Sequence, residues 1–93
     1  MKVTIEPQPR DFIRGQPPET RKSIRAIIHS IERGESVPER LEDELDGFYK
    51  IKVEGYRLVV QYVAGEAGPF YRVVFIERRA VVYEMFKQLA GLE

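Results

Sequence analysis

Cysteine is absent from this chain, and histidine occurs only once, at position 29. The first absence excludes disulfides, thiolate metal sites and cysteine nucleophiles. A single histidine without cysteine leaves no plausible protein cage for zinc. No stretch approaches the roughly 18 apolar residues of a membrane span, and the N-terminus lacks the apolar core of a signal peptide. We therefore expect a cytoplasmic protein that uses no metal, no cofactor and no membrane.

The chain also lacks an excess of charge of either sign, because 15 Lys and Arg residues balance 15 Asp and Glu residues. The net charge therefore provides no overall electrostatic attraction to nucleic acid or anionic lipid. A strongly acidic stretch, residues 39–46, lies shortly before the basic residues Lys50 and Lys52. We expect it to weaken the positive field of those lysines if the two segments fold close together.

The length of 93 residues, of which 43% are hydrophobic, predicts one domain over 1–93. Alternating apolar residues and turn signals predict strands at 2–6, 48–54, 56–63 and 70–76. Helical spacing and end signals predict helices at 9–15, 18–33 and 80–90, with a connecting loop at 34–46. The order β-α-α-β-β-β-α indicates an α+β fold, with an N-terminal helical hairpin and a C-terminal helix packed on a small antiparallel sheet.

The helix at 18–33 has the clearest pattern. Its isoleucines recur at helical spacing and form one apolar stripe: Ile24, Ile27, Ile28 and Ile31. Truncation of Ile28 to alanine should therefore destabilise the fold as a core deletion. His29 lies off this stripe, which favours a solvated histidine over a base or ligand. Arg21, Lys22 and Arg25 form a solvated face, or alternatively contact RNA.

Basic residues gather on the predicted 48–63 hairpin and after the last strand. Lys50 and Lys52 are two apart on a strand, so both project from one face of the sheet. Arg57 follows the turn at Gly55 and can be their cross-strand neighbour. Arg79 ends the last strand, and Tyr83 lies four residues further, one helical turn on. Such a cluster can stabilise the charge of a phosphoryl transition state without histidine.

A purely structural interpretation of these residues also exists. Alternating lysines on a strand are most often its solvated face. The aromatic residues of the strands can stack on bases, but they more often pack in a core. They are Tyr49, Tyr56, Tyr62, Phe70, Tyr71 and Phe75.

Three segments carry recognisable motifs: LDG at 45–47, FYKIKVEGYRLV at 48–59, and VVFIERR at 73–79 followed by Val82-Tyr83. Together they resemble the RelE/ParE toxin superfamily, and most closely the RelE-type mRNA interferases. Residues 48–59, FYKIKVEGYRLV, are similar to the "YKIK…GYRLV" of the central hairpin in that family. Residues 45–47, LDG, resemble its "L-x-G". Residues 73–79, VVFIERR, with Val82-Tyr83, resemble its last strand and the "VY" that follows. The element order agrees over the whole chain.

The resemblance implies the toxin of a type II toxin–antitoxin system. Such toxins enter the ribosomal A site and cut mRNA by metal-free attack of the 2′-hydroxyl, which inhibits translation; some serve plasmid stabilisation. Its partners would be the ribosome, mRNA and a cognate antitoxin in a hetero-oligomer.

By the same resemblance, Lys50 and Lys52 would transfer protons and contact phosphate. Arg57 and Arg79 would stabilise the phosphorane-like state, and Tyr83 would orient or deprotonate the nucleophile. Arg78 would bind RNA. Glu77, where many relatives have glycine, is expected to pair with Arg79.

Two alternatives remain open from the sequence. One is a ParE-like inhibitor of DNA gyrase, which is not an enzyme. The other is a catalytically silent module that keeps only the antitoxin-binding fold.

Overall fold

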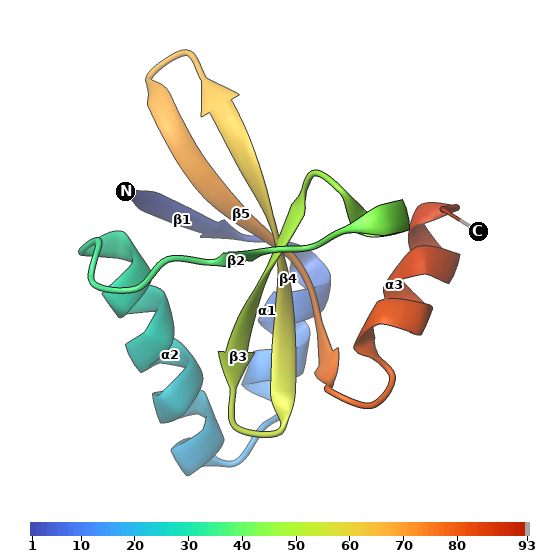
Figure 1. Ribbon diagram of the computed structural model, residues 1–93. Helices are drawn as coiled ribbons and strands as arrows, with labels where there is room; N and C mark the ends of the chain where they lie inside the picture. The colour runs from blue at the N-terminus through green and yellow to red at the C-terminus, as the bar shows by residue number, and fades with distance from the viewer. Residues whose placement is uncertain (93) are drawn as a thin grey trace.

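The computed structural model describes residues 1–92 and consists of one five-stranded sheet with three α-helices (Figure 1). The strands lie in the order β1-β5-β4-β3-β2. The element bounds are β1 Lys2–Ile5, α1 Pro7–Arg14, α2 Pro18–Glu32, β2 Glu39–Arg40, β3 Phe48–Val53, β4 Tyr56–Gly65, β5 Gly68–Arg78 and α3 Val82–Ala90. The predicted α+β class is confirmed. No helix within 1–92 is long and apolar enough to cross a membrane.

Two details of the sheet differ from the prediction. The sheet is mixed, because β1 pairs in parallel with β5 while the other neighbours are antiparallel. The segment 34–46 is also more than a loop. It contains the two-residue strand β2 and a 3₁₀ turn at Asp43–Leu45. A strand of two residues shows no period that a sequence pattern can reveal.

The helix ends follow local chemistry. Proline occupies the first turn of α1 and of α2, where a missing N–H removes no helical hydrogen bond. The last helix ends at Gly91, whose φ of 69° lies in the left-handed region that glycine adopts without steric cost. Because proline marks the starts of α1 and α2 and glycine marks the end of α3, the predicted helix boundaries agree closely with the observed ones.

Strand β4 separates two apolar cores. Leu58 and Val60 face the core beneath α1 and α2, whereas Val59 faces the core beneath α3, and all three are fully buried. Figure 1 shows α2 and α3 on opposite sides of the strands. The central strand is thus apolar on both faces, which explains its continuous hydrophobic run.

A β-bulge in β5 determines which side chains reach each core. Val59 pairs with Phe75, but the next residue, Val60, pairs with Val73, so Val74 is the extra residue. Val73 therefore packs beneath α1 and α2, while Phe75 packs beneath α3. Without the extra residue, strand alternation would put both on one face.

We expect Ile24→Ala to lower the free energy of unfolding by about 2–5 kcal/mol, because Ile24 is fully buried against the sheet. Ile27→Ala is the matched control on the same helix, since Ile27 is only partly buried and should cost less. Urea unfolding of both variants measures the difference. Equal losses would contradict the difference in burial between Ile24 and Ile27.

Candidate functional site

Three predicted basic residues lie together on the face of the sheet that α3 covers. Lys50 and Lys52 alternate with the buried Ile51 on β3, so both project from the same face. Lys52 pairs directly with Arg57 across the β3–β4 ladder, and Lys50 pairs with Val59 two residues further along β4. The structure thus brings together the cations that the sequence placed on one hairpin.

Glu39 is a site residue that the sequence analysis did not single out. It lies on β2, and its Cα is the partner of Lys50 at the edge of the sheet. Its two carboxylate oxygens each lie 3.7 Å from an ammonium, Oε2 from Lys50 Nζ and Oε1 from Lys52 Nζ. The expected weakening of the lysine field by the acidic segment therefore has a structural basis.

The bridge between Glu39 and the lysines is open to solvent. The side chain of Glu39 is 57% exposed and that of Lys52 is 53% exposed. Exposed ion pairs contribute about 0.2–1 kcal/mol each, because water screens them and the side chains lose freedom. A phosphate group can therefore replace the carboxylate beside the lysines at small energetic cost.

Arg57 is held by the turn that joins β3 to β4. Its Nη1 donates to the carbonyl oxygens of Tyr56, at 2.7 Å, and of Glu54, at 3.1 Å. Glu54 has a φ of 53°, a conformation that costs a residue other than glycine about 1–2 kcal/mol. These contacts keep the guanidinium near the end of the sheet where Lys52 lies.

Arg79 is anchored at the same turn through its backbone. Its N–H donates to the carbonyl of Gly55 at 2.8 Å, and its side chain is exposed. It lies before α3, which begins at Val82, so the expected helical spacing from Arg79 to Tyr83 is wrong. A turn over residues 79–81 joins the two residues instead.

Tyr83 lies on the first turn of α3 and packs partly buried against the core beneath that helix. Burial raises the pKa of its hydroxyl above the ordinary value, the Arg57 guanidinium opposes this rise, and the Glu39 carboxylate adds to it. Tyr83 packs on the core that contains Val59, and Val59 is the cross-strand partner of Lys50. Tyr83 therefore lies on the same face of the sheet as the basic residues.

Glu77 and Arg78 are arranged differently from the expectation. The carboxylate of Glu77 accepts the backbone N–H of Arg78 at 2.9 Å and lies 3.7 Å from Arg78 Nε. The expected pair between Glu77 and Arg79 is thus wrong, because within 1–92 Glu77 pairs with its immediate neighbour. The Cα of Arg78 is opposite Tyr56, on the face away from Arg57. Its role in RNA binding stays a prediction.

The single histidine is solvated on a helix, as predicted. His29 is exposed on α2, and its Nδ1 is 3.0 Å from a carboxylate oxygen of Glu32. Among the described residues no group of three His, Cys, Asp or Glu side chains is arranged to hold a metal ion.

The chemistry of the cluster combines three kinds of group. Lys50, Lys52 and Arg57 are donors that cannot accept a proton in their charged forms. Tyr83 supplies a hydroxyl that retains its proton at neutral pH. Glu39 supplies the carboxylate acceptor. Cations, a proton donor and a proton acceptor on one face of a sheet are suited to binding a phosphodiester and moving protons near it.

The fold and the cluster define a small α+β protein with a cationic, carboxylate-bridged site under its last helix. A solved structure, the YoeB/ParE toxin from Agrobacterium tumefaciens, has this fold with a TM-score of 0.65. The two chains are 16% identical, and the match covers 85% of this chain and 99% of that chain. The predicted RelE/ParE-type fold is therefore confirmed. No protein-family model and no curated protein sequence matches the chain.

We expect Tyr83 to ionise above about pH 10, the ordinary value for tyrosine, because burial disfavours the phenolate. Ultraviolet titration of the wild type and of Tyr83→Phe isolates this group as the difference between the curves. Since the folded state holds the proton more tightly, the associated stability is present below about pH 10 and is lost as the pH rises through the folded pKa. A midpoint at or below that of free tyrosine would contradict the assignment.

Proposed function

We propose that this protein is the toxin of a toxin–antitoxin system and a ribosome-dependent endoribonuclease that cleaves mRNA in the ribosomal A site. The observation that carries the proposal is that Lys50 and Lys52 each lie 3.7 Å from the Glu39 carboxylate, with Arg57 opposite Lys52 on the next strand and Tyr83 on the same face of the sheet. The sequence resemblance to the RelE-type toxins and the shared fold support it.

The reaction begins with the 2′-hydroxyl of the substrate, which restricts cleavage to RNA. Its oxygen attacks the adjacent phosphorus and forms a P–O2′ bond while the P–O5′ bond breaks. The products are a 2′,3′-cyclic phosphate and a free 5′-hydroxyl. The nucleophile must lose one proton and the leaving oxygen must gain one, so the site needs an acceptor and a donor.

Glu39 is the best proton acceptor at this site. The raised pKa of Tyr83 means that its phenol keeps its proton at neutral pH, so it orients the nucleophile as a hydrogen-bond partner instead of deprotonating it. The carboxylate of Glu39 acts electrostatically on the same phenol and offers two oxygens as hydrogen-bond acceptors. It takes the 2′-hydroxyl proton when the phosphate occupies the lysines.

The basic residues stabilise the rest of the reaction. Lys50 and Lys52 contact the phosphate, and one of them gives its proton to the leaving 5′-oxygen. Arg57 and Arg79 stabilise the negative charge on the equatorial oxygens. A well-placed donor of this kind contributes about 3–4 kcal/mol to the transition state, and more donors are needed because no single one neutralises the phosphorane.

The remaining parts of the proposal follow from the same toxin class. The mRNA would be the substrate, the ribosome would be a partner, a cognate antitoxin would bind and inhibit the protein, and the protein would act in the cytoplasm. Arg78, exposed beside Arg79, would contact RNA.

Arg57→Ala should lower cleavage by about 10²–10³-fold, because it removes a held donor from the transition state. The assay uses purified ribosomes programmed with a defined mRNA, and primer extension maps the breaks. Arg33→Ala, an exposed arginine at the end of α2, is the control and should cleave normally. Intact message at excess wild-type protein would refute the nuclease proposal.

Intact message would direct attention to the second candidate function, inhibition of DNA gyrase. The name of the solved relative, YoeB/ParE toxin, supports keeping this candidate. A supercoiling assay with purified gyrase decides it. If neither activity is found, the remaining interpretation is a silent module with the toxin fold.

Glu39→Gln should lower cleavage by about 10²–10⁴-fold, the usual contribution of a general base, although it also frees the two lysines. Glu42→Gln is the matched control, because it removes the same charge from an exposed residue three positions away. Cleavage by Glu39→Gln equal to or above that of the control would mean that Glu39 only screens the lysines. Thermal melting of both variants checks that the fold is intact.

A further inference from the structure

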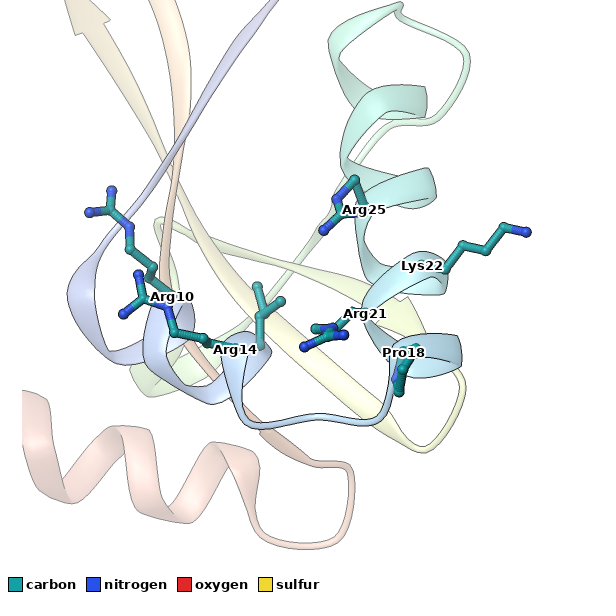
Figure 2. A pocket seen from close by; sticks show the side chains of 7 residues that line it. Arg10, Arg14, Pro18, Arg21, Lys22 and Arg25 are labelled. Carbon is teal, nitrogen blue, oxygen red and sulfur yellow. The ribbon is translucent and has the colours of Figure 1, made fainter.

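A second basic surface lies away from the site already described, between α1 and α2. It is a groove of about 640 Å³ lined by five cations together with Ile13 and Pro18, and by no acidic residue. The cations are Arg10, Arg14, Arg21, Lys22 and Arg25. Figure 2 shows Arg10 and Arg14 on α1 across the groove from Arg21 on α2, while Lys22 extends outward. We call this surface the α1–α2 groove.

The charges of the α1–α2 groove are poorly compensated inside the protein. Within 1–92, the side chains of Arg21, Lys22 and Arg25 take part in none of the ion pairs or hydrogen bonds. Arg14 is 3.7 Å from Asp11, but both side chains are more than 70% exposed, so the pair is weak. Like charges held close together attract an anionic partner from solution.

The balanced net charge of the chain conceals this groove. Residues 10–25 carry five basic and two acidic side chains, whereas residues 39–46 carry five acidic and one basic. The charge is therefore separated into opposite patches, and the absence of a global excess does not exclude an anionic partner. The relevant quantity for docking is the local field, which extends about 8 Å at physiological salt.

An apolar recess adjoins the α1–α2 groove. It has a volume of about 390 Å³, and its wall includes Val3, Ile5, Ile13 and Ile28. It shares Arg10, Ile13 and Arg25 with the groove, so the two hollows are direct neighbours on one surface. Its far rim carries His29 and Glu32, which already pair with each other at 3.0 Å. An occupant of both hollows must therefore bring negative charge and apolar side chains together.

This combination discriminates between two kinds of anionic partner. A nucleic acid backbone would pair its phosphates with the arginines but would leave the isoleucines and valine of the recess uncovered. A peptide with carboxylates on one side and aliphatic side chains on the other satisfies both hollows. We propose that the α1–α2 groove and its recess are a docking surface for an acidic, amphipathic segment of a partner protein.

The probe for this surface is a synthetic peptide of roughly 16 residues, about the length of α2 at 1.5 Å per residue. Leucines recur at i, i+3, i+4 and i+7, and the other positions are mainly glutamate. Fluorescence anisotropy with the full chain should show saturable binding that weakens with salt. A peptide with lysine in place of glutamate should not bind.

Arg21→Glu/Arg25→Glu should weaken peptide binding by about tenfold or more, because it reverses two charges that face the peptide. Lys2→Glu/Arg33→Glu changes the charge equally outside the groove and should bind within about twofold of the wild type. Arg21→Gln/Arg25→Gln, a milder pair, should give an intermediate loss and guards against misfolding of the first variant.

Three results would overturn the proposal: no binding of the acidic peptide, equal binding by the groove and control variants, or tighter binding of a short RNA duplex through the same arginines. The last result would assign the groove to RNA. The assay involves no cleavage, so its failure is distinct from failure of the proposed nuclease activity.

Discussion

The structure depends on burial of strand β4 on both of its faces. Leu58, Val59 and Val60 are fully excluded from solvent, and they join the core beneath α1 and α2 to the core beneath α3. Together they contribute several kcal/mol of burial, at about 1.5–3 kcal/mol for each large aliphatic side chain. Because Arg57 directly precedes this run, the same pairing that forms the cores also fixes the position of a catalytic candidate. Strand β4 thus contributes both to the stability of the fold and to the position of Arg57.

The bulge at Val74 extends this dependence to the end of β5. It turns Phe75 towards α3 and, by alternation, places Glu77 opposite Arg57 at the rim of the site. The chain then leaves the sheet through Arg79, whose N–H is bound to the β3–β4 turn, before α3 begins. The position of Tyr83 on this face of the sheet therefore depends on three features. They are the packing of Phe75 beneath α3, the turn that follows β5, and the start of α3 at Val82.

The sequence predicted those parts of the fold and site that depend on local pattern. The isoleucine stripe of α2 and the cross-strand pairing of Lys52 with Arg57 follow from helical and strand periods, which need no tertiary information. Glu39 could not be found in this way, because a two-residue edge strand has no period. Its position beside Lys50 depends on how the 34–46 segment returns to the sheet. The parallel pairing of β1 with β5 likewise depends on the overall topology rather than on any local signal.

The separation of charge changes the meaning of a net charge of zero. Each acidic group of residues 39–46 that lies near the lysines weakens their field, and Glu39 does so at 3.7 Å from both ammonium groups. Under the proposed function, a substrate phosphate would compete with that carboxylate, so ligands that also contact Arg57 and Tyr83 would bind better than simple anions. The α1–α2 groove has no such internal competitor among its lining residues. A chain balanced overall can therefore present a compensated basic cluster on one surface and an uncompensated one on another, because the distribution of charge, not its sum, sets each local field.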